Sequence, residues 1–395
     1  MLISIAYITF AGLILGYLFK KIKFPSLFGM LLAGIIIGPH VLNLIDNSIL
    51  SISSEIRKIA LIIILIRAGL KLSLEDLKKV GRPAVLMCFL PAAFEVLGMT
   101  LLAPKFLNIT TLDAAILGAV IGAVSPAVIV PRMIKLIDEG YGTKQSIPQM
   151  ILAGASVDDV FVIVLFTTFT ALANGESVNI RSFINIPISI IIGALVGIAI
   201  GYALFVYFDK VHMKDTVKVI IMLGVSFVLT YIEDRWGYII PFASLISIMA
   251  IGTVLKKKKQ ELSSRLSLKF DKLWVGAEIF LFVLVGASVE ISTLKEAGLS
   301  AVLLIFCMLI FRMLGVYICL LCTGLRIREK IFCMLSYMPK ATVQAAIGGI
   351  PLAMGLACGN VVLMVSVVAI MITAPLGAFA IDITYKNYLE KADIT

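Results

Sequence analysis

Two adjacent aspartates, Asp158 and Asp159, lie in a segment with no other charged residue between Lys144 and Glu176. An ionised side chain at the centre of an apolar span costs about 2.5–3.5 kcal/mol, and such residues usually mark functional sites. A carboxyl group in this setting can hold a proton or bind a hard cation, which prefers oxygen ligands. We therefore interpret the aspartate pair as the candidate site.

The composition indicates that the elements around this pair lie in a lipid bilayer. Hydrophobic residues make up 61% of the 395 residues, charged residues make up 15%, and the mean hydropathy is +1.08. A soluble core of this size could not bury so much apolar surface. Short segments of alternating polarity, which are typical of membrane barrels, are absent from the sequence, so only a helical bundle can span the membrane. The sequence predicts an all-α polytopic membrane protein.

Apolar runs separated by loops with charge, Pro or Asn predict about 13 transmembrane helices, each of about 20 residues. The expected spans are 1–19, 27–45, 53–72, 83–103, 111–135, 147–173, 183–208, 217–233, 239–255, 272–291, 297–321, 329–355 and 359–384. With the N-terminus outside, most of the 34 Lys and Arg residues fall in inward loops and the C-terminal tail. This bias predicts a cytoplasmic C-terminus in the plasma membrane. The net charge of +10 is then mainly a topology signal with some attraction to anionic lipid, and it requires no nucleic-acid partner.

Five charged residues are predicted at mid-depth in the spans: Glu95, Asp158, Asp159, Arg312 and Lys340. Left unpaired, they would together cost on the order of 15 kcal/mol, more than a marginally stable protein can tolerate. We therefore expect these side chains to form ion pairs or to contact water.

Two prolines interrupt predicted spans at mid-depth, Pro126 in the fifth and Pro339 in the twelfth. Proline lacks a backbone N–H and frees the carbonyl four residues earlier, which is Gly122 in one span and Leu335 in the other. In hydrocarbon such groups need new partners, which a cavity or an ion can supply. Interrupted helices at corresponding positions of two halves indicate the substrate site of an inverted-repeat transporter.

Dividing the chain at the seventh span gives two halves of six spans with opposite orientation. The fourth span then corresponds to the eleventh, which places Glu95 and Arg312 on equivalent helices, and the fifth corresponds to the twelfth. We predict two inverted six-helix repeats with crossing discontinuous helices. Because broken helices carry partial charges at their ends, we expect Lys340 to meet the negative ends and Asp158 or Asp159 to meet the positive ones.

Three motifs resemble the monovalent cation/proton antiporter superfamily: Ala-Ser-Val-Asp-Asp-Val at 155–160, Tyr-Met-Pro-Lys-Ala-Thr-Val-Gln at 337–344, and Leu-Ala-Gly-Ile-Ile-Ile-Gly-Pro at 32–39. The proline-lysine motif is most similar to the NHA-type sodium/proton antiporters, and the resemblance covers nearly the whole chain. It implies a homodimeric transporter of Na⁺ or Li⁺ and H⁺, surrounded by lipid, that is not an enzyme and needs no cofactor.

The resemblance also implies roles for individual residues. Asp159 corresponds to the principal cation and proton carrier, and Asp158 to its neighbour beside a basic side chain. Many members with an Asp-Asp pair have lysine where this chain has Arg312. Because arginine effectively never loses its proton, we expect Arg312 to be a structural partner of Glu95, which favours exchange of one cation for one proton. Lys340 is a second supporting charge that could still take part in proton exchange.

The predicted mechanism is competition between a proton and Na⁺ (or Li⁺) for one site at Asp159. The hydroxyl groups of Ser125 and Ser156 and the Gly122 carbonyl could complete the cation's oxygen shell, beside Asp158. By resemblance, core transport helices in 83–173 and 297–395 move against panel helices in 1–82 and 209–296 that form the dimer interface. Residues 174–208 would form the linker helix, and the chain would end in a short cytoplasmic tail.

Other classes of protein remain open at this point. Potassium/proton exchange and a sodium-coupled symporter of similar fold are the nearest alternatives, and a cation channel is a third. An intramembrane aspartyl protease is disfavoured, because its two acids must face each other, whereas adjacent residues of a helix diverge by about 100°. Cys319 and Cys322 form a single C-x-x-C without the second pair that a structural zinc site needs.

Overall fold

The computed structural model describes residues 1–22, 24–71, 81–174, 180–236, 242–289 and 291–392. The described residues are almost entirely helical, and the only extended pairing among them is one isolated bridge between Tyr141 and Lys391. The predicted all-α class is confirmed.

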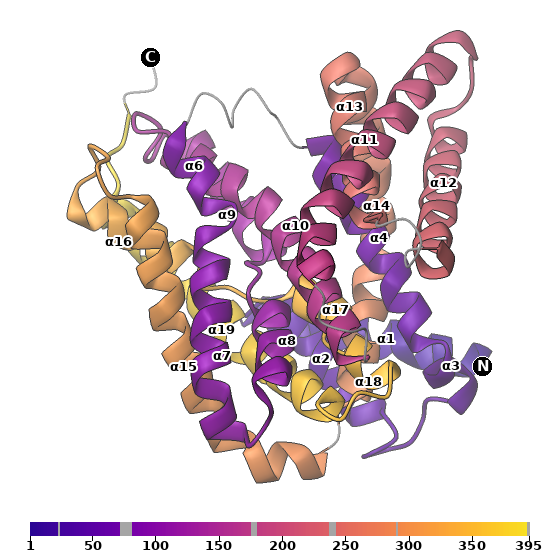
Figure 1. Cartoon of the computed structure of the whole chain (residues 1–395), viewed down its shortest axis with the longest axis vertical. Coiled ribbons are helices and arrows are strands. Elements are labelled where there is room, and N and C mark those ends of the chain that lie inside the picture. Colours follow the sequence, from indigo (N-terminus) through magenta and orange to yellow (C-terminus); the bar gives the residue numbers. More distant parts are fainter. Residues whose placement is uncertain (23, 72–80, 175–179, 237–241, 290, 393–395) are drawn as a thin grey trace. The chain divides into compact units, whose positions relative to one another are not determined.

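The helices follow the order of the predicted spans (Figure 1). Their bounds are α1 (Leu2–Lys21), α2 (Ser26–Ile37), α3 (Asn47–Ser51), α4 (Ser53–Lys71), α6 (Arg82–Met87), α7 (Leu90–Leu107), α8 (Thr111–Ile121), α9 (Pro126–Glu139), α10 (Ile147–Ala173), α11 (Ile180–Lys210), α12 (Asp215–Trp236), α13 (Ser244–Lys258), α14 (Gln260–Ala287), α15 (Ile291–Cys319), α16 (Ile327–Ser336), α17 (Thr342–Ile347), α18 (Ile350–Ala353) and α19 (Gly359–Tyr388).

Seven segments within the described residues are long and apolar enough to cross a membrane. They are Leu2–Lys21, Arg82–Leu107, Thr111–Glu139, Ile191–Lys210, Asp215–Arg235, Gly298–Cys319 and Gly359–Tyr388. Shorter apolar helices occupy Ser26–Ile37, Phe161–Ala173 and Thr342–Ala353. The chain is therefore a multi-pass membrane protein, while the count of 13 spans stays a prediction.

Contacts divide the chain into two compact units. The first comprises Met1–Arg57, Glu75–Asn174 and Ile279–Thr395, and the second comprises Lys58–Leu74 and Gly175–Glu278. The aspartate pair and the other charges predicted at mid-depth all belong to the first unit. This division reflects packing density, so the predicted boundaries of the panel, linker and core helices, which concern motion, stay predictions.

Both predicted helix interruptions are present in the first unit. The fifth span is divided into α8 and α9, and Pro126 is the first residue of α9, where a missing N–H costs nothing. The twelfth span is divided into α16, α17 and α18, with Pro339 in the connection between α16 and α17. The backbone N–H of Ser125 donates to the Pro339 carbonyl at 2.8 Å, so the two interruptions are in direct contact.

Helices α7 and α15, which carry Glu95 and Arg312, run side by side in Figure 1. Gly98 of α7 lies against the ring of Phe311, and Gly315 of α15 lies against the backbone of Pro91. Small residues at these crossings let two membrane helices approach closely. This close approach brings the acid of one helix within reach of the base of the other.

Two predicted span boundaries are wrong. The span expected at 27–45 ends at Ile37, because Gly38 precedes Pro39 and takes ψ 174°, and a residue before proline avoids the helical region. The span expected at 272–291 belongs to a helix that begins at Gln260. Its first turns carry Glu261 and Arg265, so a search for apolar runs does not detect them.

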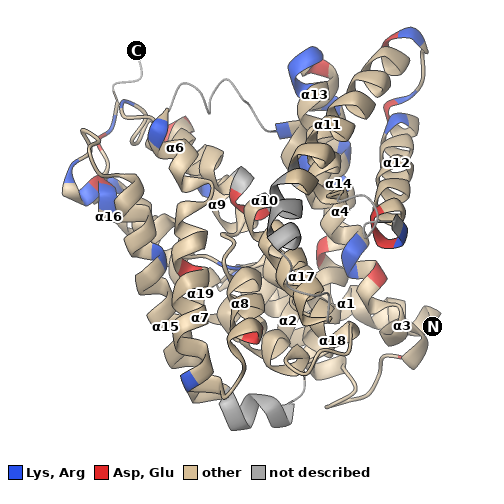
Figure 2. Cartoon of the chain, viewed as in Figure 1, with Lys and Arg blue, Asp and Glu red and all other residues tan. Residues whose placement is uncertain are grey.

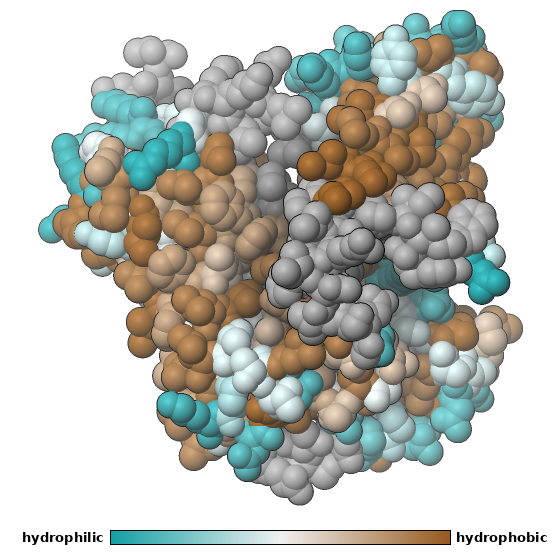
Figure 3. Space-filling model, in the orientation of Figure 1, coloured by the Kyte–Doolittle hydropathy of each residue, from teal (hydrophilic) through white to brown (hydrophobic). Residues whose placement is uncertain are grey.

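The surface of the first unit matches a lipid environment. Lys and Arg residues gather at the ends of α6 and α16, and the bodies of α7 and α15 are largely without them (Figure 2). The face over α7 and α15 is hydrophobic in Figure 3. These two helices carry apolar side chains that are about half exposed or more, among them Leu97, Leu101, Leu303 and Ile310. Exposed apolar side chains of this density are expected where acyl chains cover the protein.

The contact between α2 and the end of α14 supplies a test of the fold. A Cβ atom on Gly286 would overlap the Leu31 carbonyl, whereas no described atom lies within 4 Å of a Cβ built on Gly276 of the same helix. Alanine is favoured over glycine in a helix by about 1 kcal/mol where space allows. We expect Gly286→Ala to lower the melting temperature in detergent and Gly276→Ala to leave it equal or higher. Equal melting temperatures for the two variants would contradict this packing.

Candidate ion-binding site

Asp158 and Asp159 lie in the middle of the unbroken helix α10 and are both buried, with 0% and 4% of their surface exposed. Because consecutive residues of a helix point about 100° apart, their carboxyl groups meet different neighbours. The two carboxyl groups therefore have separate environments and can perform separate tasks.

Asp158 is bound from two sides. Its Oδ2 accepts a hydrogen bond from the backbone N–H of Val124 at 2.8 Å, in the interruption between α8 and α9. The same oxygen accepts from Arg312 Nη2 at 2.9 Å. Val124 lies just before the N-terminus of α9, so Asp158 meets the positive helix end that the sequence predicted for one of the two aspartates.

Arg312 connects four parts of the site. Its Nη1 donates to Glu95 Oε2 at 2.7 Å and also to the Gly122 carbonyl, and its Nε donates to the Tyr337 carbonyl at 2.5 Å. Only a planar guanidinium presents enough donors, in a fixed geometry, to bind two carboxylates and two carbonyls together. A single side chain of α15 therefore joins α7, α10 and both helix interruptions.

Lys340 occupies a different position from the one predicted. Its Nζ donates to Glu95 Oε2 at 2.5 Å, and its backbone N–H donates to Thr373 Oγ1 at 2.9 Å. The carbonyls at the ends of the broken helices, predicted as its partners, are bound by Arg312 instead. The reason is geometric, because the guanidinium reaches the carbonyls and the acids at once while the ammonium group is already engaged with Glu95.

These contacts form a buried network of four charges that balance. Arg312 and Lys340 carry two positive charges, and Glu95 and Asp158 carry two negative charges, all at 1% exposure or less. Asp159 has no ion pair with a described residue, and its Oδ1 has no hydrogen-bond partner there. An ionised carboxyl group without a partner is strongly disfavoured in a buried site. Asp159 is the buried acid of the pair that still requires a proton or a cation.

Other oxygen atoms near the interruptions are also without partners among the described residues. The hydroxyl groups of Ser125 and Thr342 are buried and accept or donate no hydrogen bond there. The Gly122 carbonyl, predicted as a free ligand, accepts a hydrogen bond from Arg312. The side chain of Ser156 lies outside the described residues. Sequence reasoning missed Thr342, although its position two residues after Lys340, beside a helix break, could have indicated it.

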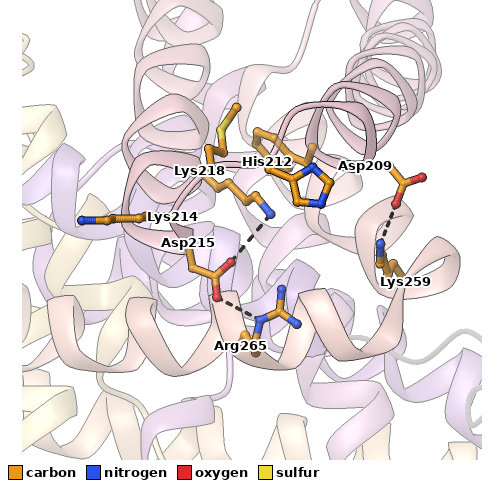
Figure 4. Close-up of a pocket in the computed structure, with 9 residues that line it drawn as sticks. Asp209, His212, Lys214, Asp215, Lys218, Lys259 and Arg265 are labelled. Atoms are coloured by element: carbon orange, nitrogen blue, oxygen red, sulfur yellow. Dashed lines mark hydrogen bonds and ion pairs between the residues drawn. The ribbon is translucent and has the colours of Figure 1, made fainter.

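The second unit contains a surface hollow of about 530 Å³ (Figure 4). It is lined by Phe208, Asp209, His212, Met213, Lys214, Asp215, Lys218, Lys259 and Arg265. Both of its acids are already paired, Asp209 with Lys259 at 2.5 Å and Asp215 with Arg265 at 2.9 Å. The hollow therefore offers no free carboxylate for a cation.

Removing Arg312 tests the network. Arg312→Met leaves Asp158 buried without its counter-charge, and breaking a buried ion pair in this way costs about 3–5 kcal/mol. Arg265→Met breaks an exposed pair and should cost at most about 1 kcal/mol. We expect the first variant to melt far below the second in detergent. The double variant Arg312→Met/Asp158→Asn should recover part of the loss, and equal melting of the two single variants would refute the network.

Comparison with known proteins places the chain in a family. The family described as "Sodium/hydrogen exchanger, transmembrane" matches residues 6–386. Human sodium/hydrogen exchanger 9B2 is 32% identical to this chain, over 99% of the chain and 76% of that protein. Human sodium/hydrogen exchanger 9B1 is also 32% identical, over 99% of the chain and 78% of that protein.

A solved structure has the same fold. The sodium proton antiporter MjNhaP1 from Methanocaldococcus jannaschii at pH 8 superposes with a TM-score of 0.85, over 98% of this chain and 99% of that one. Its sequence identity is 20%, so this likeness concerns the fold alone. Because the family and the curated relatives match nearly the whole sequence, the chain is a transporter and not an enzyme. The chain belongs to the sodium/hydrogen exchanger family of membrane antiporters.

Proposed function

We propose that the chain exchanges Na⁺ or Li⁺ for H⁺ by alternating access, with the cation and the proton competing for Asp159. Membership of the exchanger family supports sodium and protons as the transported ions. The observation that carries the finer proposal is the position of Asp159 outside the balanced network of Arg312, Lys340, Glu95 and Asp158.

Charge balance supports the competition. With the other four charges paired, an ionised Asp159 adds one uncompensated negative charge to a buried site. A proton or a monovalent cation restores neutrality, and each excludes the other because they need the same oxygens. Release of one ion therefore requires uptake of the other before the site can move through the low-dielectric part of the membrane.

The oxygen ligands for the cation would come from the two helix interruptions. Asp159 Oδ1, Ser125 Oγ and Thr342 Oγ1 are buried atoms without partners among the described residues. Hard cations bind carboxylate and hydroxyl oxygens, and water molecules would complete the shell. We assign Asp158 a supporting role, because its Oδ2 is already engaged with Arg312 and Val124.

The contacts also support a stoichiometry of one cation per proton. Arg312 keeps its proton under all relevant conditions. Lys340 forms an ion pair with Glu95, and this pair opposes loss of the Lys340 proton. Asp159 is then the residue whose protonation changes during the cycle, and the exchange is electroneutral.

The proposed large-scale arrangement rests on the resemblance to the family. Core helices in 83–173 and 297–395 would move against panel helices in 1–82 and 209–296, with 174–208 as linker. Inverted repeats, a homodimer and lipid contacts are parts of the same proposal. The distribution of Lys and Arg supports an orientation with the N-terminus outside and the C-terminus in the cytoplasm, and location in the plasma membrane is part of the same proposal.

The first test removes the carrier. We expect Asp159→Asn, reconstituted in liposomes, to reduce Na⁺-driven proton flux to the level of protein-free vesicles, measured with an internal pH-sensitive dye. Asp46→Asn is the control, because Asp46 is an exposed helix-capping acid. Parallel gradients of Li⁺ and K⁺ identify the cation. Exchange by Asp159→Asn at the wild-type rate would exclude Asp159 as the carrier.

The second test addresses the competition itself. Because a proton must leave the carboxyl group before a cation binds, the apparent KM for Na⁺ should rise as the pH falls, by up to about tenfold per pH unit. The maximum rate at saturating Na⁺ should stay nearly constant. Initial rates at a series of Na⁺ concentrations and pH values measure both quantities. A constant KM with a falling maximum rate would show that protons act elsewhere.

A further inference from the structure

Three successive carbonyls at the end of α8 lose their helical partners at the interruption. In a continuous helix the Ile121 carbonyl would accept from the N–H of Ser125, which donates to Pro339 instead. The Gly122 carbonyl would accept from residue 126, which is a proline without an N–H. Within a membrane such groups must find partners inside the protein.

Gln344 supplies the partners for two of these carbonyls. Its Nε2 donates to the Ile121 carbonyl at 3.1 Å and to the Ala123 carbonyl at 2.8 Å, on either side of the Gly122 carbonyl bound by Arg312. Gln344 is fully buried in the first turn of α17. One amide group of the second broken helix therefore holds the end of the first.

The chemistry of the amide group suits this position. A carboxylate would repel the two carbonyls, and an ammonium group would add a third positive charge to a network that already balances. A neutral NH₂ group provides two donors without a charge. The segment that it holds leads directly to Val124, which binds Asp158, and to Ser125, whose hydroxyl has no partner among the described residues.

We propose that Gln344 is a positioning residue that sets the affinity of the site for the transported cation. By fixing the carbonyls of Ile121 and Ala123, it fixes where Ser125 can present its oxygen beside the aspartate pair. This inference rests on the proposed function and adds a residue to it. A role in helix packing is the alternative interpretation of Gln344. A packing role affects stability, whereas a positioning role affects the KM for the cation.

The experiment compares Gln344→Met with wild type in liposomes. Methionine has a similar volume and no donor, so both carbonyls lose the hydrogen bond from Gln344, and we expect the KM for Na⁺ to rise about fivefold to tenfold, which corresponds to about 1–1.4 kcal/mol. The kcat should change less than twofold. The matched control is Ser226→Ala, which removes a buried hydroxyl that donates to the Met222 carbonyl of its own helix at 2.8 Å. Its KM should equal that of the wild type.

A second readout separates affinity from transport. The Na⁺ concentration that gives half of the maximal thermal stabilisation in detergent should rise by the same factor in Gln344→Met. The inference would be overturned if both the KM and the Na⁺ concentration for half-maximal stabilisation were unchanged, with or without a lower melting temperature. If Gln344→Met does not fold, the KM of Gln344→Asn tests the inference instead, because the asparagine amide is one methylene too short to reach both carbonyls. A wild-type KM for that variant overturns the inference, and a raised KM supports it.

Failure of the proposed function would look different. In that case the wild-type protein itself would show no Na⁺-driven proton flux and no stabilisation by Na⁺. Wild-type exchange with an unaltered Gln344→Met variant rejects only the role of Gln344.

Discussion

A guanidinium group buried in a membrane protein must find its counter-charges and acceptors within the protein, and Arg312 meets this requirement in full. Its donors bind Glu95, Asp158 and the carbonyls of Gly122 and Tyr337. Arg312 shares Glu95 with Lys340 and Asp158 with the Val124 N–H, and it supplies the ion pair that Asp158 makes among the described residues. The rest of the site depends on this interaction, because one rigid side chain fixes four elements relative to each other.

The helix interruptions and the charges are two parts of one solution. Breaking a helix in hydrocarbon exposes carbonyls and N–H groups, and burying charges requires acceptors and donors. Here the side chains supply partners for the interrupted backbone, since Arg312 and Gln344 bind carbonyls that have lost their helical partners. Asp158 in turn accepts a hydrogen bond from a backbone N–H in the interruption. The interruptions can therefore persist at the centre of the bundle without water supplying every partner.

The proposed function assigns separate roles to the charges that hold the structure and to the charge that takes part in transport. Four charges that balance can remain ionised through a transport cycle and keep the geometry constant. In the proposed function, the remaining acid, Asp159, changes its occupant, and the net charge of the site depends on that occupant alone. An exchanger of sodium and protons, the family to which the chain belongs, needs a site that binds either ion while the surrounding structure stays the same.

The sequence by itself determined that the protein lies in a membrane, that it is helical, where two helices are interrupted and which charged residues lie at mid-depth. These features follow from hydropathy, proline chemistry and the cost of a buried charge, which are local properties of the chain. The sequence suggested Arg312 as a partner of Glu95, but it did not determine that Arg312 also binds Asp158 or that Lys340 binds Glu95. Lys340 was assigned the carbonyls that Arg312 binds, and Thr342 and Gln344 were not recognised as neighbours of the site. Only the crossing of distant helices decides such pairings, since partners such as Asp158 and Arg312 lie far apart in the chain. The tertiary structure therefore decided that Asp158 is bound within the network and that Asp159 is left outside it.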